Sequence, residues 1–190
     1  MHPQKKSLQL GNSIIFDKVF EAGTFITFYS ETYKPVPDKN VDVDNTSLNI
    51  QSLDDDYLLH ISFRRAENQI VFNSFPVTPE TLEWGPEDRV SLQGVFSKTD
   101  ARVSVRLEAN HYKVYVDDSI IHTYKKRIIK DAQRISYRTN SESVFTNPIT
   151  VEVLAPEEGL VKKIGPAASY EKAYFNLNAK DVAEESGEQD

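Results

Sequence analysis

The chain of 190 residues contains no cysteine, and this absence excludes several kinds of chemistry. Without thiols the protein cannot form disulfide bonds, use a cysteine nucleophile or bind a metal ion through cysteine. Only four histidines are present, and they are scattered along the sequence. A domain of this length buries roughly 70% of its unfolded surface, so one hydrophobic core can stabilise it without a disulfide or a metal ion.

Long apolar runs are also missing. No stretch approaches the 18 or so apolar residues that a transmembrane helix requires. The first residues, MHPQKKSLQL, carry two lysines but lack the apolar segment of a secretion signal. We therefore expect a soluble protein without membrane insertion and without a signal peptide, located in the cytoplasm or exported by a non-classical route.

Acidic residues outnumber basic ones, 29 to 22, which gives a net charge of −7. An acidic protein repels a phosphate backbone unless its positive charges gather on one face. The basic run YKKRIIK at residues 124–130 alternates like the end of a strand, so we interpret its lysines as surface residues with packed stems. We expect no nucleic-acid partner.

The first three quarters of the chain consist of short alternating runs rich in β-branched and aromatic residues. Pro, Gly, Asn and Asp separate the runs, which is typical of strands joined by turns. About eleven such strands without a helix between them predict an all-β protein whose antiparallel sheets pack as a sandwich. The strands are expected near residues 7–10, 24–30, 46–50, 57–64, 68–74, 89–96, 102–108, 111–117, 120–126, 133–138 and 144–154.

The composition changes after about residue 156, where eight acidic and four basic residues remain. Four residues recur there at helical spacing after Ser169, a suitable helix cap: Tyr170, Ala173, Tyr174 and Leu177. Two interpretations stay open, a short amphipathic helix that docks on a sheet or a partner and an acidic disordered terminus. We divide the chain into an N-terminal extension at 1–6, a main domain at 7–155 and an acidic tail at 156–190.

A polar row interrupts the apolar stretch LLHISFRRAENQIVFNS at residues 58–74. Because side chains alternate between the faces of a strand, every second residue from Leu59 to Phe63 faces the core. The opposite face then carries three polar residues: His60, Ser62 and Arg64. The next strand repeats the pattern and turns Asn73 outward. Each residue alone is typical of a solvated sheet face, so the interpretation depends on the whole set.

The segment WGPEDR contains the only tryptophan, Trp84. Gly85 and Pro86 predict a turn, after which Glu87 and Arg89 project from one face. Taken alone, Trp84 is typical of a packing residue. Glu87 and Arg89 alone are typical of a surface ion pair of little energy.

Together these side chains suit a neutral sugar. A guanidinium, a carboxylate and an amide match the paired donors and acceptors of sugar hydroxyls, and charge strengthens the hydrogen bonds. A flat indole covers the apolar face of a pyranose ring. If Glu87 lies between Arg64 and Arg89, each side chain fixes the rotamer of the next, so less entropy is lost on binding.

The same residues, in the same order, resemble the carbohydrate-recognition domain of the galectin family. The family pattern H-x-N-x-R, V-x-N and W-x-x-E-x-R is matched by HISFR at 60–64, VFN at 71–73 and WGPEDR at 84–89. Serine at position 62 replaces the asparagine, and the segments LLHIS, ENQIVFNS and WGPEDR resemble the fungal branch in particular. The resemblance covers roughly residues 7–155.

This resemblance implies a galectin-type jelly-roll β-sandwich of two antiparallel sheets that binds β-galactosides without a metal ion or other cofactor. It implies that His60 and Arg64 hold the axial 4-hydroxyl of galactose, and that Asn73 and Glu87 hold the 6-hydroxyl. It further implies that Arg64, Glu87 and Arg89 hold the adjoining sugar. The implied carbohydrate-binding residues are His60, Ser62, Arg64, Asn73, Trp84, Glu87 and Arg89, with Trp84 against the galactose face.

The contact made by Ser62 stays open, because serine is shorter than asparagine and can reach a sugar directly, through water or not at all. Within the family, preference beyond the core disaccharide depends on the loop near residues 34–46. A disaccharide of about 23 heavy atoms binds with at most about −7 kcal/mol, so useful avidity requires several sites. We therefore expect a homo-oligomer that binds glycans and glycoconjugates containing β-galactosides.

Other functions fit these residues less well. A glycoside hydrolase needs two carboxyl groups about 5–10 Å apart, and Glu87 has no obvious second on its face. Neighbouring arginines would also lower the pKa of Glu87, which is wrong for a general acid, so we expect no enzyme. The aspartates near residues 42–44 and 54–56 lack the spacing of a calcium loop. A galectin-related lectin with shifted specificity, for example for chito-oligosaccharides, stays open, although Trp84 argues against it.

Overall fold

The structure, a computed structural model, describes residues 4–77 and 82–156, and these residues form strands and loops without a helix. The all-β prediction is therefore confirmed. Nothing in this part of the chain is a helix long and apolar enough to cross a membrane. The strands are β1 (Gln4–Leu8), β2 (Ser13–Ile15), β3 (Phe25–Ser30), β4 (Thr46–Gln51), β5 (Tyr57–Arg64), β6 (Gln69–Phe75), β7 (Asp88–Ser91), β8 (Ala101–Leu107), β9 (His111–Val116), β10 (Ser119–Lys125), β11 (Arg134–Thr139) and β12 (Ile149–Leu154).

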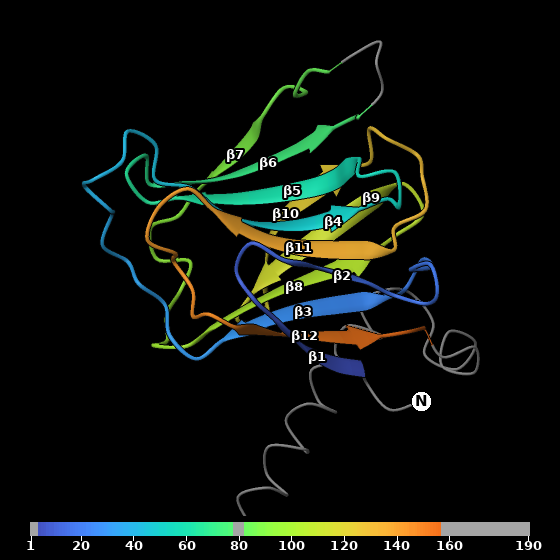
Figure 1. Cartoon of the computed structure of the whole chain (residues 1–190), viewed down its shortest axis with the longest axis horizontal. Helices are drawn as coiled ribbons and strands as arrows, with labels where there is room; N and C mark the ends of the chain where they lie inside the picture. The colour runs from blue at the N-terminus through green and yellow to red at the C-terminus, as the bar shows by residue number, and fades with distance from the viewer. Residues whose placement is uncertain (1–3, 78–81, 157–190) are drawn as a thin grey trace, which may run out of the picture. The chain divides into compact units, whose positions relative to one another are not determined.

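The strands form two antiparallel sheets of six strands each (Figure 1). One sheet has the order β1-β12-β3-β8-β9-β10, and the other has the order β2-β11-β4-β5-β6-β7. Neighbours in each sheet often come from distant parts of the sequence, such as β11 beside β4 and β12 beside β3. This arrangement confirms the predicted sandwich of two antiparallel sheets.

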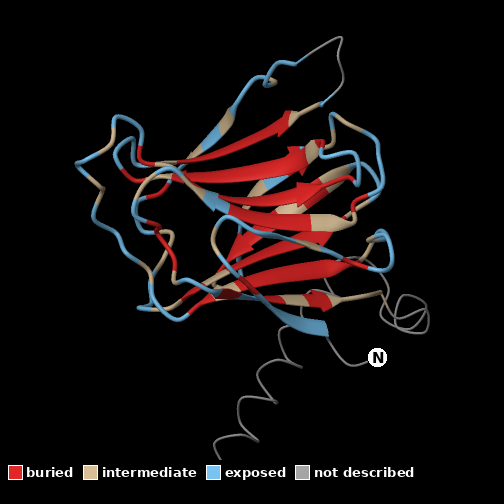
Figure 2. Ribbon diagram, in the orientation of Figure 1, coloured by how far each residue is buried: buried red, intermediate tan, exposed pale blue. Residues whose placement is uncertain are grey.

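The core lies between the sheets, because each strand turns alternate apolar side chains inward. On β5 the side chains of Leu59, Ile61 and Phe63 are at most 1% exposed, as their alternation predicts. Ile70 and Phe72 on β6 are fully buried beside them. Figure 2 shows the buried residues along the central strands of both sheets and the exposed ones mainly in the loops. Each large apolar side chain buried in this way contributes about 1.5–3 kcal/mol.

The Asn and Asp residues between neighbouring strands adopt the backbone that hairpins need. Asp117 and Asp118 both have positive φ angles, 45° and 70°, and join β9 to β10 through a two-residue link. Asn68 has a φ of 53° in the link between β5 and β6. Asparagine and aspartate tolerate this left-handed region better than other residues with a Cβ. The β5–β6 hairpin sets the register in which His60 lies opposite Asn73.

Several strand limits differ from the sequence prediction for local reasons. The first strand begins at Gln4 instead of residue 7, and the short edge strand β2 was not predicted. β7 ends at Ser91 because the chain turns at Gln93 and Gly94, where the φ of Gly94 is +73° and the N–H of Val95 donates to the carbonyl of Leu92. β12 begins only at Ile149, because Pro148 has no N–H to donate to a neighbouring strand. The predictions for the tail, including its helix, fall on residues outside the described part, apart from Pro156.

Candidate functional site

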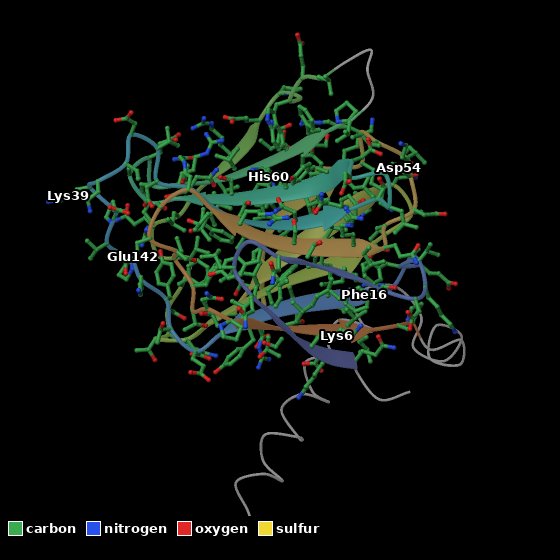
Figure 3. All side chains as sticks on the ribbon, in the orientation of Figure 1. Lys6, Phe16, Lys39, Asp54, His60 and Glu142 are labelled. Carbon is green, nitrogen blue, oxygen red and sulfur yellow. The ribbon has the colours of Figure 1, made fainter. Side chains whose placement is uncertain are left out.

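The predicted residues lie together at the β5–β6–β7 side of one sheet. The register places His60 on β5 (Figure 3) between Asn49 on β4 and Asn73 on β6. Two residues further along β5, Ser62 lies in one row with Arg89, with a single strand between them. Hydrogen bonds link Arg64 to Ser62 and Arg89 to Glu87, and a ring contact links Trp84 to His60. The structure thus brings together His60, Ser62, Arg64, Asn73, Trp84, Glu87 and Arg89.

Two arginines and two glutamates form a closed ring of ion pairs. Glu87 lies between Arg64 and Arg89: its Oε1 accepts from Arg64 Nη2 at 2.8 Å, and its Oε2 accepts from Arg89 Nε at 2.9 Å. Glu67 closes the ring, since its Oε2 accepts from Arg89 Nη1 at 2.8 Å and its Oε1 lies 3.5 Å from Arg64 Nη1. The side chains of Glu87, Glu67 and Arg89 are 31–42% exposed, so the ring fixes rotamers more than it stabilises the fold.

Glu67 corrects one sequence-based expectation, that no second carboxylate lies beside Glu87. Glu67 follows Arg64 by three residues, and this spacing could have indicated the pair. Burial raises the pKa of Glu87, but hydrogen bonds from Arg64 and Arg89 outweigh this effect and hold the pKa below its usual value. Glu87 is therefore an anionic hydrogen-bond acceptor at neutral pH, not a proton donor.

The imidazole of His60 is held in one tautomer. Its Nδ1 lies 2.6 Å from Oδ1 of Asn49. The amide nitrogen of Asn49 donates to the hydroxyl of Ser136 at 3.1 Å, which turns the amide oxygen toward the imidazole. His60 Nδ1 must then carry the proton, and Nε2 is an acceptor. Burial, followed by the charge of Arg64, lowers the pKa of His60 to about 4, against a smaller opposing effect of Glu87.

Ser62 is completely buried, and its hydroxyl is engaged by the protein. It donates to Oδ1 of Asn45 at 2.5 Å and accepts from Nε of Arg64 at 3.2 Å. A chain of hydrogen bonds therefore runs from Asn45 through Ser62 to Arg64. Asn45 and Asn49 could not be recognised as site residues from the sequence, because their roles depend on partners in other strands.

Trp84 lies at the edge of a small aromatic cluster with 48% of its surface exposed. Its ring centroid is 4.7 Å from that of His60, 5.0 Å from that of Phe75 and 5.6 Å from that of Tyr57. The carbonyl of the next residue, Gly85, accepts a hydrogen bond of 2.8 Å from the amide of Asn73. The indole is thus supported by neighbouring rings and keeps surface free for a ligand.

Three of the aspartates considered for calcium, Asp44, Asp55 and Asp56, are engaged by basic side chains. Asp44 pairs with Arg65 at 2.7 Å, and Asp56 pairs with Lys130 at 2.6 Å. Asp55 pairs with a further arginine. Within residues 4–77 and 82–156, no group of three or more His, Asp and Glu side chains is placed to hold a metal ion.

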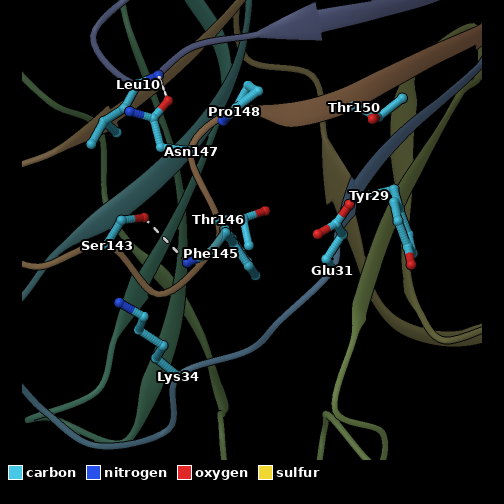
Figure 4. A pocket seen from close by; sticks show the side chains of 10 residues that line it. All are labelled: Leu10, Tyr29, Glu31, Lys34, Ser143, Phe145, Thr146, Asn147, Pro148 and Thr150. Atoms are coloured by element: carbon cyan, nitrogen blue, oxygen red, sulfur yellow. Dashed lines mark hydrogen bonds between the residues drawn. The ribbon is translucent and has the colours of Figure 1, made fainter.

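A groove of about 550 Å³ lies in another part of the fold (Figure 4). It is formed where the loop before β12 passes the end of β3. Several of its polar groups are bonded within the protein: Asn147 accepts from the backbone N–H of Leu10, and the Ser143 hydroxyl contacts Tyr137 at 2.5 Å. None of the predicted site residues lines this groove.

Comparison with known proteins places this chain in a family. The sequence profile of the family described as galactoside-binding lectin matches residues 13–144. Galectin-1 of Coprinopsis cinerea is 31% identical over 160 residues, which cover 84% of this chain and 97% of that protein. Galectin-2 of the same fungus is 34% identical over 122 residues, covering 64% of this chain and 76% of that protein.

Solved structures agree on the fold. Galectin LEC-6 of Caenorhabditis elegans has a TM-score of 0.60 at 15% identity, covering 79% of this chain and 95% of that chain. Chicken Galectin 2 has a TM-score of 0.56 at 16% identity, covering 78% of this chain and all of that chain. Because the family consists of lectins, the prediction of a non-enzymatic binding protein is confirmed. The chain belongs to the galactoside-binding lectin family, the galectins, and is a carbohydrate-binding lectin.

Proposed function

We propose that this galectin binds β-galactosides of the lactose and N-acetyllactosamine type at the site on β5, β6 and β7. The observation that carries the proposal is the closed ring of Arg64, Glu87, Arg89 and Glu67 beside the exposed indole of Trp84. Its donors and acceptors are already ordered, so little conformational entropy is lost when a sugar binds. The polar groups need no metal ion or other cofactor to contact hydroxyls.

The axial 4-hydroxyl distinguishes galactose from glucose, and His60 and Arg64 are proposed to read it. Neutral His60 offers an acceptor at Nε2, and Arg64 offers guanidinium donors. One hydroxyl can donate to Nε2 of His60 and accept from the guanidinium of Arg64 at the same time. An equatorial 4-hydroxyl cannot make both contacts while the sugar ring lies on Trp84. With glucose, the polar groups of His60 and Arg64 would therefore lack ligand partners.

The remaining contacts follow from the protonation states of the site. The Glu87 carboxylate accepts from the 6-hydroxyl, and the Asn73 amide donates to it. Arg64, Glu87 and Arg89 hold the adjoining sugar, and the indole of Trp84 covers the C–H face of galactose. Ser62 acts through Arg64 and Asn45, because its own hydroxyl is buried and bonded to both.

The proposal extends to assembly and location. A single shallow site of this kind binds a disaccharide with a dissociation constant of about ten micromolar to a millimolar. Homo-oligomers raise the effective affinity for glycan-bearing surfaces, because several sites bind one particle. We infer a homo-oligomer in the cytoplasm or exported by a non-classical route, and sedimentation at micromolar concentration tests its assembly. A sedimenting species of monomer size alone would contradict it.

A lactose titration followed by tryptophan fluorescence tests the binding proposal. Trp84 is the only tryptophan, so its emission reports on the proposed site alone. We expect a saturable change with lactose and none with maltose, whose single free 4-hydroxyl is equatorial. A response to chitotriose but not to lactose would favour a galectin with shifted specificity. An unchanged spectrum up to tens of millimolar lactose would contradict the proposal.

A further inference from the structure

Arg127 belongs to the basic segment at residues 124–130 but contacts residues of the sugar site. It follows β10, a strand of the sheet that does not carry the site. Its Nη1 donates to Oδ1 of Asn73 at 3.3 Å and also to the carbonyl oxygen of Pro86. Its Nη2 donates to Oδ1 of Asp88 at 2.8 Å. One guanidinium thus connects the other sheet to both β6 and the segment WGPEDR.

These contacts limit what Asn73 can offer to a ligand. The amide oxygen accepts from the backbone N–H of Ser74 at 2.8 Å and from Arg127, so both of its lone pairs are used. The amide nitrogen donates one hydrogen to the carbonyl of Gly85 at 2.8 Å. A single N–H therefore remains, and Asn73 can act toward a sugar only as a donor.

Two further features hold Arg127 in place. Asp88 anchors its guanidinium and also contacts Nε2 of His122 at 3.0 Å. The guanidinium lies 4.8 Å from the ring centroid of Tyr124, which is a cation–π distance. The carboxylate and the ring fix the guanidinium from different sides, and its side chain is only 28% exposed.

The position of Gly85 shows how closely these groups are packed. A Cβ atom added there would lie 3.1 Å from Arg127 Nη1 and 3.1 Å from Asn73 Oδ1. Such separations are tighter than nine in ten contacts of real Cβ atoms, so with any other residue the guanidinium or the amide would have to shift by a few tenths of an ångström. Because Trp84 directly precedes Gly85, the same contacts also fix the backbone position from which the indole of Trp84 projects.

We propose that Arg127 is a positioning residue of the carbohydrate site. It orients the Asn73 amide so that an N–H faces the sugar, and it fixes the turn that carries Trp84. Recognition of the 6-hydroxyl then depends on a side chain that comes from the opposite sheet. This inference rests on the proposed galactoside binding, in which Asn73 donates to the 6-hydroxyl.

The test compares lactose with 6′-deoxylactose, which lacks that hydroxyl, by isothermal titration calorimetry. Arg127→Met keeps an unbranched, flexible side chain but removes the guanidinium and all of its donors. We expect the variant to bind lactose about tenfold more weakly, as the loss of an oriented hydrogen bond predicts, and 6′-deoxylactose less than about threefold more weakly. The preference of the wild type for lactose over the deoxy sugar should therefore shrink.

Matched variants separate positioning from charge and from folding. Lys125→Met removes a cation from the same segment and should leave both affinities unchanged. Asp88→Asn weakens the anchor and should reduce the preference for the 6-hydroxyl to a smaller extent. Each variant is first compared with the wild type by circular dichroism and thermal unfolding. If Arg127→Met does not fold, the Asp88→Asn comparison decides the outcome.

The possible results are distinct. Equal losses for both sugars, or no loss at all, would overturn the proposed dependence of 6-hydroxyl recognition on Arg127. Absence of lactose binding by the wild type would instead contradict the proposed function itself. A smaller preference for the 6-hydroxyl, with unchanged folding and an intact Lys125→Met control, would support Arg127 as the positioning residue.

Discussion

Arg65 and Asp44 form an almost completely buried ion pair, with side chains that are 1% and 0% exposed. Two hydrogen bonds of 2.7 Å join the guanidinium to the two carboxylate oxygens. The guanidinium also donates to the carbonyl oxygens of Lys34 and Glu142, at 3.0 and 2.5 Å. Three segments that are distant in the sequence are therefore connected next to Asn45, a residue bonded to the site.

Removing one member of this pair should destabilise the protein strongly. In Arg65→Met the Asp44 carboxylate stays buried without its counter-ion, which costs about 3–5 kcal/mol in comparable cases. We expect a decrease of this size in the free energy of unfolding, measured by urea denaturation. Lys34→Met removes the exposed pair with Glu142 and should change stability by less than about 1 kcal/mol. Equal effects of the two variants would contradict this prediction.

The pKa of His60 predicts how stability depends on pH. Its value is about 4 in the folded protein because burial and then Arg64 lower it, whereas an unfolded histidine has a pKa near 6.5. Between these values the unfolded state binds more protons, so the free energy of unfolding falls as the pH decreases from about 6.5 to 4. The contribution of His60 to this decrease is at most about 3 kcal/mol.

A non-titrating variant isolates this effect. His60→Gln should show a weaker dependence of stability on pH between about 4.5 and 6.5 in urea denaturation. The lowered pKa of Glu87 acts mainly below this window, because its stabilising charge is lost as the pH falls through the folded pKa. If the free energy of unfolding changes with pH equally in the wild type and in the variant, the buried neutral His60 does not cause the loss of stability at lower pH.

Glu67 should matter for sugar binding more than for folding. Glu67→Gln removes one side of the ion-pair ring, so Arg64 and Arg89 become less ordered before the sugar binds. We expect lactose affinity to fall by about two- to fivefold, while stability changes by less than about 0.5 kcal/mol. Calorimetry and urea denaturation measure the two effects. Glu21→Gln, the same change at an exposed loop residue, is the control and should alter neither.

Strand alternation made much of this site predictable from the sequence. A period of two places His60 and Arg64 on one face of a strand whatever the rest of the fold does, and a hairpin brings Asn73 opposite. The motif WGPEDR keeps Trp84, Glu87 and Arg89 close to one another by sequence alone. These relationships are local, so composition and spacing reveal them.

The remaining features depend on contacts between distant segments. Arg65 meets Asp44 across 21 positions and Glu142 across 77 positions, and no periodic pattern links them. Arg127 reaches Asn73 across 54 positions and from the other sheet, so the sequence indicated only a basic strand end. β2 has three residues, too few to show an alternation. Such features become visible only when the sheet order is known.

Ser62 offers a test of how this galectin tolerates serine at a position where the family pattern has asparagine. Ser62→Ala removes both the acceptor for Arg64 Nε and the donor to Asn45, and both groups are partly buried. Leaving them without a partner costs about 1–3 kcal/mol, so we expect the free energy of unfolding to fall by this amount in urea denaturation. Lactose affinity should fall several-fold as Arg64 loses its orientation.

Ser62→Thr is the matched control for Ser62→Ala, because it keeps the hydroxyl and adds one methyl group at a fully buried position. If the hydroxyl orders the site through its hydrogen bonds, the threonine variant should retain lactose affinity better than the alanine variant. This holds even where crowding by the added methyl group lowers the stability of the threonine variant. If Ser62→Ala binds lactose as tightly as the wild type, the hydrogen-bond chain from Asn45 to Arg64 does not order the site. Arg64 would then be held in place by Glu87 and Glu67 alone, and the Glu67→Gln loss should be correspondingly larger.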